Sequence, residues 1–401
     1  MKSIEILENV IQEYSWGSYT EIPEILGQKC PSSNPQAELW MGAHPIASSM
    51  LTVNGKKESL YELVKKYPDE ILGKSVSKRF GVSFPFLFKV LAAEKPLSIQ
   101  VHPNLKQAKE GYEKENKERI ALNFEKRNYK DKNHKPECIC ALTDFWVLNG
   151  FRKISDIVSF MERLSGGIIE NEISQLKKSE DTKGLKCFFK ALMTTGSKKK
   201  ENLINTVVLN AEKNDTADPS YRWITELHKE YGNDIGVISP LLLNLVCLKP
   251  GEAMFLYSGE LHAYLKGVCI ELMTNSDNVI RGGLTIKHVD ILELLRIVKF
   301  EEKSIKLLAP EQAGKMEIFY PCAATEFLLS RIHVQQNDNF TSSQKRSVEI
   351  MMCVDGNAAI QDIDSGKTIN LEKGTSVLIP AVVNMYQLKG EAILYKAGVP
   401  L

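Results

Sequence analysis

The segment from Leu97 to His102 carries side-chain types that bind divalent metal ions. Its apolar and polar residues alternate, and the polar ones are Ser98, Gln100 and His102. Because side chains on a strand point to the same face at every second residue, these three polar groups share one face if the segment is a strand. An amide and an imidazole two residues apart on such a face can both reach one metal ion. The alternative is a half-exposed strand with an ordinary polar side.

A second candidate ligand, His262, ends a pattern of turn residues. Gly251, Tyr257 and Gly259 precede it with the spacing Gly-x5-Tyr-x-Gly-x2-His. The pattern resembles the second cupin fingerprint, in which a proline stands where this chain has Tyr257. A turn glycine, a short strand and a second tight turn would direct the histidine into a β-barrel. The spacing therefore favours a metal ligand at this position.

The C-terminal part of the chain repeats this pattern without its histidine. Gly374 and Pro380 restart the spacing, but Val382 stands where the second glycine would be and Met385 where the histidine would be. We therefore expect two cupin-like β domains. Only the first has residues that can bind a metal, so the second is expected to be structural.

Glu137 is the carboxylate that could complete the ligand set. It opens the strand-like run Cys138–Leu142, and by itself it would be an ordinary carboxylate at the start of a strand. Together with Gln100, His102 and His262, it supplies two imidazoles, one carboxylate and one amide oxygen. A mixed set of nitrogen and oxygen ligands suits Zn²⁺, with Mn²⁺, Fe²⁺ or Co²⁺ as alternatives.

Short apolar runs indicate strands that would position these residues in two parts of the chain. The runs lie between Gly, Pro and Asn residues up to about Gly150 and again from Pro240 to the C-terminus. Examples are Phe84–Ala93, Leu241–Leu248, Val268–Met273, Met351–Val354 and Ala392–Tyr395. One helix is expected at Leu60–Lys66.

The segment between about Arg152 and Gly236 has a helical period instead. Its apolar residues recur at the spacing of one helix face. The runs are Ile154–Leu164, Leu203–Val208 and Trp223–Tyr231. Ser155 and Ser220 are expected to be N-caps, and Gly232 ends the last pattern. This part is predicted to be a small helical domain.

The predicted fold class is therefore mainly β, with two cupin-like jelly-roll β domains and an inserted all-helical domain. Residues 1–151 and 237–310 would form a discontinuous cupin catalytic domain, and residues 152–236 the helical insertion. Residues 311–401 would form a C-terminal cupin-like β domain without metal ligands. The lysines Lys198–Lys200 are expected in a solvated loop.

Composition argues against several classes of partner. The 401 residues include 51 Lys and Arg and 50 Asp and Glu, a net charge of +1, so the sequence predicts no nucleic-acid or membrane partner. No apolar run approaches the roughly 18 residues of a membrane-spanning helix, and Met1–Tyr14 lacks the apolar core of a signal peptide. The eight cysteines are scattered and form no CxxC pair, which fits reduced thiols in a cytoplasmic protein.

Six ordered blocks resemble type I mannose-6-phosphate isomerases across nearly the whole chain. They are Tyr14–Gly17, Ala37–Pro45, Leu97–Pro103, Asn133–Glu137, Gly259–Tyr264 and Asn278–Lys287. Six blocks in order are far harder to meet by chance than one. The family has a cupin catalytic domain, a helical insertion and a second β domain. Two positions depart from its pattern, because Ile286 replaces a usual proline and Leu39 a common aromatic residue, and neither is a ligand.

The resemblance implies a zinc-dependent isomerase that interconverts mannose 6-phosphate and fructose 6-phosphate through a cis-enediolate. One Zn²⁺ per chain would be held by Gln100, His102, Glu137 and His262, and Arg281 would be the catalytic arginine. The partner would be a small-molecule sugar phosphate. The chain is expected to be a monomer or a weak homo-oligomer.

Several polar residues in or near these blocks suit the needs of such a reaction. The fixed cation Arg281 can stabilise negative charge that develops on the substrate. Lys287 and Ser98 are the candidates for binding the phosphate, because they offer charge and a hydroxyl donor. Tyr264 is expected to complete the substrate pocket.

The sequence leaves the proton-transfer group open. Lys135 lies two residues from Glu137 and is the expected catalytic group. Glu271 alternates with apolar neighbours, so it should point away from them, where its carboxylate would suit either contact with sugar hydroxyls or proton transfer. Asp277 and His134 are rivals for proton transfer.

Two other classes of protein remain compatible with the sequence. The first is a cupin metalloenzyme of another reaction type, such as an iron oxygenase with a 2-His-1-carboxylate triad and open positions. Gln100 as an extra ligand argues against that class. The second is a non-catalytic sugar-phosphate-binding cupin, which would need neither Arg281 nor Lys135 beside an intact ligand set.

Overall fold

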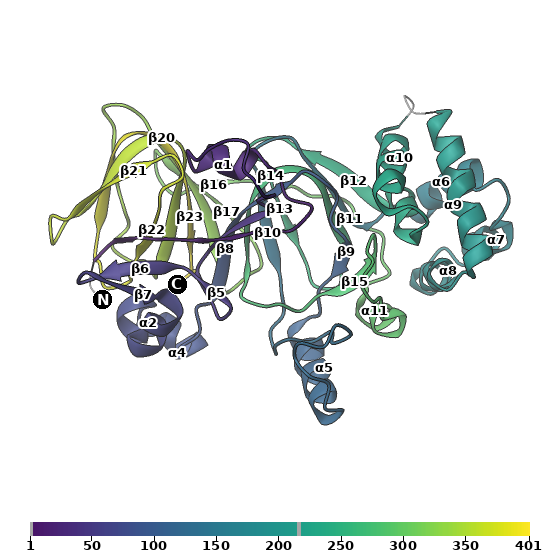
Figure 1. Ribbon diagram of the computed structural model, residues 1–401, viewed down its shortest axis with the longest axis horizontal. Helices are drawn as coiled ribbons and strands as arrows, with labels where there is room; N and C mark the ends of the chain where they lie inside the picture. The colour runs from purple at the N-terminus through teal and green to yellow at the C-terminus, as the bar shows by residue number, and fades with distance from the viewer. Residues whose placement is uncertain (1–2, 215–217) are drawn as a thin grey trace.

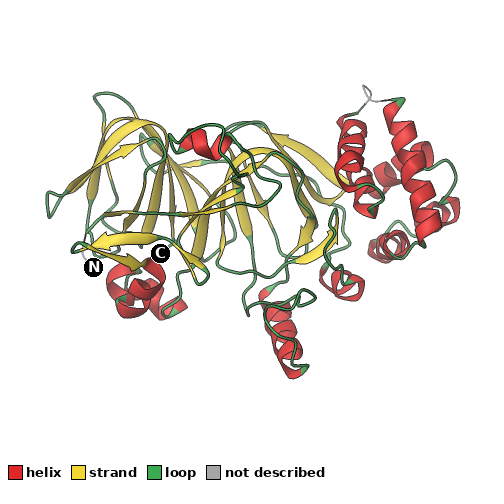
Figure 2. Cartoon of the chain, viewed as in Figure 1, coloured by secondary structure: helices red, strands yellow, loops and turns green. Residues whose placement is uncertain are grey.

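The computed structural model describes residues 3–214 and 218–401 of the chain. Residues 1–2 and 215–217, which fall in the expected first and helical segments, lie outside this description. Two β regions stand side by side, and a block of helices lies beyond one of them (Figure 1). Strands dominate both regions while most of the helices gather at one end (Figure 2), so the prediction of a mainly β fold with an added helical segment is confirmed.

The first β region contains the segments with the candidate ligands. Its strands are β2 (Val10–Gln12), β3 (Glu38–Met41), β8 (Phe86–Ala93), β9 (Ile99–Val101), β10 (Glu137–Ala141), β11 (Phe145–Phe151), β12 (Leu243–Leu248), β13 (Ala253–Leu256), β14 (His262–Thr274) and β15 (Ile280–Gly283). The main path of this sheet is β12-β11-β14-β8-β3-β2. Strand β10 pairs with β13 and β14, and β9 pairs with β14 and β15, all antiparallel. The long strand β14 therefore connects the strands that carry the candidate ligands.

The second β region is formed mainly by the C-terminal part of the chain. Its strands are β1 (Glu5–Ile6), β16 (Glu311–Gln312), β17 (Glu317–Tyr320), β18 (Leu328–Val334), β19 (Asn339–Thr341), β20 (Glu349–Asp362), β21 (Thr368–Glu372), β22 (Ser376–Ile379) and β23 (Tyr386–Gly398). Its main path is β1-β22-β20-β23-β18-β17-β16. Strand β1 thus brings the N-terminal part of the chain into a sheet of C-terminal strands.

The turn pattern that the sequence repeats has a counterpart in each β region. Gly251 and Gly374 have φ values of +86° and +90°, and a four-residue strand begins two residues after each. In the first region, Gly259 (φ +86°) then turns the chain toward His262. Glycine suits these positions because positive φ is unfavourable for other residues. The second region continues from Pro380 into β23 instead.

Strand β8 separates two apolar interiors. Phe86 and Phe88 belong to a core that also contains Ile350 of β20, so this core joins the two β regions. Leu91 belongs to a different core, inside the first region. Because successive side chains of a strand point to opposite faces, Lys89 projects to the same side as Leu91.

The helical block has its own packed interior. Its elements are α6 (Ile154–Leu164), α7 (Glu170–Lys178), α8 (Thr182–Met193), α9 (Ser197–Glu212), α10 (Pro219–Tyr231) and the 3₁₀ helix η1 (Ile235–Leu241). Their buried residues form one core with Ile99, Leu261 and Ile280 of the first β region. The helical block therefore packs against the outer face of the strands that carry the candidate ligands.

Two local predictions in the helical block are wrong. Lys198–Lys200 lie in the first turn of α9 instead of a loop, because lysine is a good helix former and the apolar residues that follow bury one face. The N-caps of α6 and α10 are Lys153 and Asp218, not the predicted serines at positions 155 and 220. The Asp218 side chain accepts a hydrogen bond from the backbone of Ser220 at 2.7 Å. The predicted end of α10 at Gly232 is confirmed.

The remaining helices and short strands surround the two sheets. They are α1 (Glu21–Ile25), α2 (Leu60–Lys66), α3 (Pro68–Ile71), α4 (Lys74–Phe80), α5 (Leu105–Lys117), α11 (Ile291–Ile297), β4 (Ala43–His44), β5 (Ala47–Ser48), β6 (Met50–Val53) and β7 (Lys56–Ser59). Helix α2 has the predicted bounds. Helix α5, which projects from the molecule in Figure 1, was not predicted because few of its residues are apolar. Among the described residues, no helix has both the length and the apolar character needed to cross a membrane.

The core shared by the two β regions should make them unfold together. Ile350 is 0% exposed in that core, so Ile350→Ala should lower the free energy of unfolding by about 2–5 kcal/mol. Ile363→Ala, at a 38% exposed position, is the control and should change it by less than about 0.5 kcal/mol. All four tryptophans precede residue 224, so their fluorescence during urea unfolding reports the first region and the helical block. A fluorescence midpoint unchanged by Ile350→Ala would show that the regions unfold separately.

Candidate metal centre

Three buried side chains from different strands meet inside the first β region. His102 follows β9, Glu137 begins β10 and His262 begins β14. One possible ligand atom of each lies within 4.8 Å of the others. His102 Nε2 lies 3.1 Å from Glu137 Oε1, and His262 Nε2 lies 3.4 Å from Glu137 Oε2. The structure therefore brings three of the predicted ligands to one point.

The other ring nitrogen of each histidine faces a backbone carbonyl. His102 Nδ1 lies 2.7 Å from the carbonyl oxygen of Asn278, and His262 Nδ1 lies 3.0 Å from that of Glu260. A carbonyl oxygen can only accept, so each Nδ1 carries the hydrogen and donates. In the neutral form of each ring, Nε2 therefore presents a lone pair toward the carboxylate of Glu137.

With both rings neutral, the two Nε2 atoms and the Glu137 oxygens that they face are all acceptors, and no hydrogen lies between them. Nε2 of His102 is buried and has no hydrogen-bond partner, although a Glu137 oxygen is close. Burial lowers the pKa of His102 to about 4, and the charge of Lys135 adds to this effect. Burial alone would raise the pKa of Glu137, but the charge of Lys135 holds it well below its usual value. A neutral imidazole and an ionised carboxylate facing each other in a buried site fit a divalent cation such as Zn²⁺.

Gln100, the fourth predicted ligand, lies on β9. Its Cα pairs with that of His262 on one neighbouring strand and with that of Arg281 on the other. Directly opposed residues on adjacent strands present their side chains to the same face. Ile99 and Val101, in the opposite phase, belong to the core shared with the helical block. The three strands therefore carry a row of polar side chains in which half-buried Gln100 stands between a histidine and an arginine.

A buried lysine that the sequence did not predict lies next to the site. Lys89 is 5% exposed, and its Nζ lies 2.8 Å from Glu271 Oε2 and 3.1 Å from Glu38 Oε2. Trp40 Nε1 donates to the same Glu38 oxygen at 2.6 Å. Burial alone would lower the pKa of Lys89, but Glu271 and Glu38 raise it well above its usual value. The available signal was a single lysine within the otherwise apolar run Phe86–Ala93.

Tyr264 connects this lysine and its partners to the ligand carboxylate. Its hydroxyl lies 2.9 Å from Glu137 Oε2 and 3.0 Å from Glu271 Oε1, and its single hydrogen can serve one of them at a time. Burial and then the charges of Glu137 and Glu271 raise the pKa of Tyr264 well above its usual value. Burial also raises the pKa of Glu271, against the effect of Lys89. Polar contacts therefore continue from the candidate ligands through Tyr264 and Glu271 to Lys89.

Cations gather near the arginine end of the polar row. Burial lowers the pKa of Arg281, and burial followed by the charge of Arg281 lowers that of Lys287. Burial also lowers the pKa of Lys130, with contributions from Arg127 and Arg281. An anion bound here would relieve the repulsion between these neighbouring cations. Ser98, the other candidate for phosphate binding, is half-buried directly before β9.

The candidates for proton transfer have different partners. Lys135 Nζ lies 3.1 Å from the nearer oxygen of the ligand carboxylate. Asp277 Oδ1 lies 3.4 Å from His44 Nε2. His134 Nε2 lies 2.9 Å from Glu326 Oε1, and it therefore contacts the C-terminal part of the chain. Within the described part of the chain, Lys135 is the one of these three candidates that forms an ion pair with a predicted ligand.

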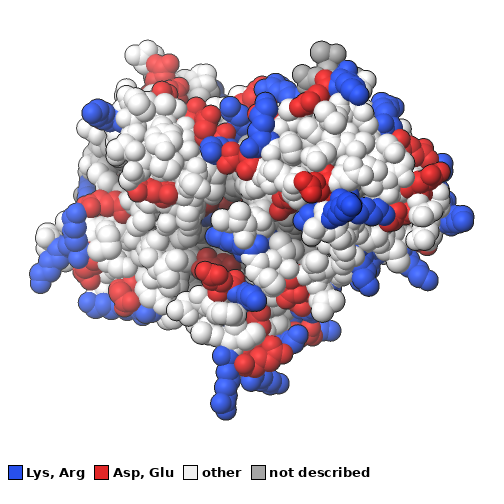
Figure 3. All heavy atoms as spheres, turned by 45° about the vertical axis from the view of Figure 1, so that its right-hand side comes forward, with Lys and Arg blue, Asp and Glu red and all other residues white. Residues whose placement is uncertain are grey.

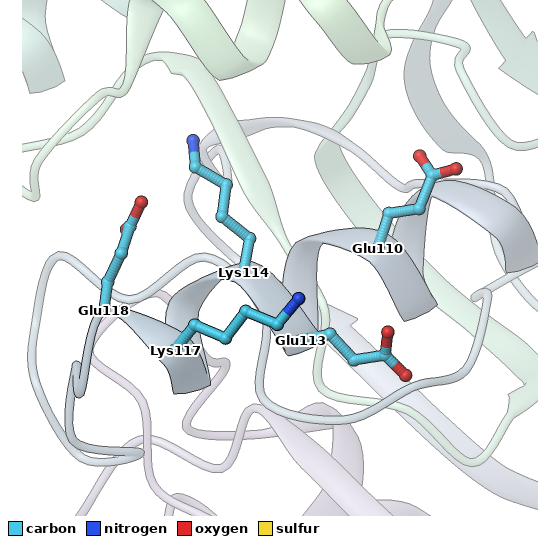
Figure 4. A pocket seen from close by; sticks show the side chains of 5 residues that line it. All are labelled: Glu110, Glu113, Lys114, Lys117 and Glu118. Carbon is cyan, nitrogen blue, oxygen red and sulfur yellow. The ribbon is translucent and has the colours of Figure 1, made fainter.

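A surface hollow on α5 is separate from this group of residues. It is lined by Glu110, Glu113, Lys114, Lys117 and Glu118, which project from one helix and its end (Figure 4). Charged side chains on one exposed helix are ordinary surface groups, so this hollow is not the candidate site. Figure 3 shows charges of both signs on the visible face of the molecule and a recess near its centre. This mixture agrees with the net charge of +1.

Comparisons with known proteins identify relatives along the whole chain. Residues 4–154 match the family model described as phosphomannose isomerase type I, catalytic domain, and residues 317–397 match that described as mannose-6-phosphate isomerase, cupin domain. The chain is 41% identical to the mannose-6-phosphate isomerase of Salmonella typhimurium over 94% of both proteins. It is 33% identical to that of Mus musculus over 98% of this chain and 95% of the relative.

Solved structures show the same similarity in three dimensions. A mutant of phosphomannose isomerase from Salmonella typhimurium aligns with a TM-score of 0.93 at 38% sequence identity. A mannose 6-phosphate isomerase described as holo and zinc bound aligns with a TM-score of 0.92 at 39% identity. Both alignments cover 100% of this chain and of the other. The prediction of a cupin fold with a helical segment is thus confirmed across the full chain.

Removing the charge of Lys89 should leave two buried carboxylates without their counter-ion. Lys89→Met should therefore lower the free energy of unfolding by about 3–5 kcal/mol near neutral pH, measured by urea unfolding of the metal-free protein. Lys266→Met is the control, because the Lys266 side chain is 57% exposed. Its ion pair with Glu94, at 3.5 Å, lies on the surface. Its effect should stay within about 0.5 kcal/mol.

The pH dependence of the Lys89→Met deficit has a defined sign. Without the lysine, the raised pKa of Glu271 should rise further above its unfolded value of about 4.3. When a carboxyl group has a higher pKa in the folded state than in the unfolded state, the folded protein loses stability as the pH rises above the unfolded pKa. The deficit should therefore be smaller at pH 5 than at pH 8. A deficit that grows on acidification would contradict this account.

Proposed function

The chain belongs to the type I phosphomannose isomerase family, and on that premise we propose that it interconverts mannose 6-phosphate and fructose 6-phosphate beside His102, Glu137 and His262. The reaction is an aldose–ketose isomerisation within one substrate molecule. The observation that supports this location is the convergence of two imidazole lone pairs and one carboxylate at a single buried point. The row of side chains through Gln100 to Arg281 extends this point toward a region of positive charge.

One Zn²⁺ per chain would be held by Gln100, His102, Glu137 and His262. The tautomers of the two histidines and the ionised state of Glu137 suit such an ion, and one structurally similar isomerase is described as zinc bound. When bound, the zinc ion would supply a Lewis acid next to the substrate. Charge stabilisation, phosphate binding and proton transfer are assigned to side chains of the protein itself.

Arg281 is proposed to stabilise the negative charge that forms during the reaction. Isomerisation moves a proton between C1 and C2, and a cis-enediolate carries the charge between the two steps. Arg281 lies on β15 opposite Gln100, and its partial burial would strengthen electrostatic contacts with a bound substrate. Lys287 and Ser98 are proposed to bind the phosphate. The cations gathered around Arg281 support this assignment.

Lys135 is proposed to hold or deliver the proton, and Glu271 and Tyr264 are proposed to contact the sugar. Lys135 lies against the ligand carboxylate, which places its ammonium beside the reacting carbons if the substrate binds there. Glu271 remains an alternative proton carrier because burial raises its pKa. Asp277 and His134 are the weaker alternatives, since their contacts are to other groups.

The setting proposed for the enzyme is cytoplasmic, with a sugar phosphate as its small-molecule partner. The cysteines of the described residues are free thiols, which supports a reducing compartment. The nearly balanced charge supports the absence of a nucleic-acid partner. A monomer or a weak homo-oligomer is the proposed state in solution.

Chelation tests the proposed metal and the reaction in one assay. Prolonged dialysis against EDTA should abolish the conversion of mannose 6-phosphate to fructose 6-phosphate in a coupled assay, and added Zn²⁺ should restore it. His262→Ala should purify folded but with little zinc by elemental analysis, because one strong ligand is lost. His333→Ala removes an exposed histidine of β18 and should keep both zinc and activity. Full zinc occupancy in His262→Ala would contradict the ligand set.

Steady-state kinetics separate the roles proposed for Arg281 and Lys287. Arg281→Ala should lower kcat by about a hundred- to a thousandfold with KM nearly unchanged, because the charge it meets exists mainly in the transition state. Lys287→Ala should instead raise KM, because a phosphate contact contributes equally before and during the reaction. Arg281→Lys should recover only part of the activity. If Arg281→Ala changed KM alone, Arg281 would bind substrate without stabilising the enediolate.

A further inference from the structure

The turn between Arg281 and Lys287 has a strained backbone. Leu284, inside this turn, has φ +52° although it is not a glycine, and its side chain is 1% exposed. The left-handed conformation is unfavourable for a leucine, so it persists only where surrounding contacts require it. The turn follows β15 directly. The contacts that hold it therefore bear on the directions of both cationic side chains.

Asp234 at the end of the helical block supplies these contacts. Its Oδ1 accepts hydrogen bonds from the backbone N–H of Gly236 at 2.7 Å and of Leu284 at 2.8 Å. Its Oδ2 accepts one from the N–H of Thr285 at 3.3 Å. One carboxylate thus holds two successive amides of the turn, and bonds to an ionised acceptor are stronger than neutral ones.

Two glycines bring the backbones of η1 and β15 into direct contact at the same place. A Cβ atom on Gly236 would lie 2.7 Å from the backbone nitrogen of Leu284. A Cβ atom on Gly283 would lie 3.1 Å from the Cα of Gly236. Side chains at these positions would therefore push the two segments apart. The junction is specific to the end of the helical block and the turn that follows Arg281.

We propose that Asp234 is a positioning residue, which sets the directions of Arg281 and Lys287 by holding the turn Gly283–Thr285. On one side, β15 is fixed by its pairing with β9 through Gln100. On the other side, Lys287 N–H donates to Thr285 Oγ1 at 3.0 Å, so order in the turn extends to Lys287. This proposal rests on the proposed function, because it takes both cations as parts of the active site. Asp234 itself acts only through the turn.

A purely structural role for Asp234 would be to cap η1. Capping explains its bond to Gly236, but it does not require the bonds to Leu284 and Thr285. Asp181 offers a matched control for this role, because it caps α8 in the same helical block and accepts a hydrogen bond from Gly184 N–H at 2.8 Å. Asp181→Ala should therefore remove a cap without changing the turn.

Steady-state kinetics of Asp234 variants test the proposal. Asp234→Ala at full zinc content should lower kcat and raise KM, so that kcat/KM falls about 10- to 100-fold, as expected for misplaced groups. Asp181→Ala should lower the Tm yet keep kcat and KM within about twofold. Asp234→Asn should recover part of the loss, because one oxygen remains to accept. Wild-type values of kcat and KM in Asp234→Ala would overturn the proposal.

A double-mutant comparison distinguishes an effect through Arg281 from general damage. In an Arg281→Ala background, Asp234→Ala should lower kcat by much less than it does in the wild type, because the group it positions is already absent. The same fold loss in both backgrounds would overturn the proposed coupling. If Asp234→Ala does not fold, Gly236→Ala carries the test, because it displaces Leu284 while keeping the carboxylate, and it should give the same fall in kcat/KM.

Hydrogen exchange provides a readout that does not depend on activity. The peptide that contains Leu284 and Thr285 should exchange faster in Asp234→Ala than in the wild type, and Asp181→Ala should leave it unchanged. Unchanged exchange in Asp234→Ala would overturn the proposal. An inactive wild-type enzyme would instead refute the proposed function, and exchange would still decide whether Asp234 holds the turn.

Discussion

The buried carboxylate of Glu137 faces two imidazole lone pairs, and this contact sets the requirement that the surrounding structure meets. Backbone carbonyls hold the Nδ1 hydrogens of His102 and His262, so in the neutral rings neither Nε2 can donate toward the carboxylate. Positive charge must therefore come from elsewhere, and Lys135 supplies some of it at 3.1 Å. A divalent ion at the same point would satisfy all three acceptors at once. Because Glu137 is buried, water cannot solvate its negative charge, so a nearby positive charge is needed to stabilise it.

The second β region shows how the same architecture handles buried carboxylates without a predicted ligand set. Lys396 Nζ lies 2.8 Å from Glu317 Oε1 and 3.1 Å from Glu349 Oε1, all three largely buried. Tyr386 donates to the other oxygen of Glu349 at 3.0 Å. A lysine between two glutamates, one of which accepts from a tyrosine, also occurs around Lys89 in the first region. Arg346 also lies 3.6 Å from Glu349, so two cations of the chain face these two carboxylates, which suits a structural domain.

The helical block bears on the chemistry through the outer face of the first sheet. Residues that alternate with the site residues, such as Ile99 and Leu261, pack into the core of this block. The inner face of these strands therefore carries the candidate site residues, and the outer face packs against the helical block. The contact between η1 and the end of β15 continues this relation at the backbone, where Asp234 meets the turn after Arg281. A helical segment far from the candidate ligands in the sequence thus contacts the turn that follows Arg281.

Local patterns in the sequence determined the mainly β class, the helical segment and the residue types suited to a metal, because strand and helix periods and turn glycines are properties of neighbouring residues. The candidate ligands could be named from the same patterns and from the six family blocks. Tertiary structure alone decided the partners of Lys89, the contact of His134 with Glu326 and the role open to Asp234. These depend on pairs separated by 50 residues or more. No local period encodes such pairs, because chain topology and packing bring them together.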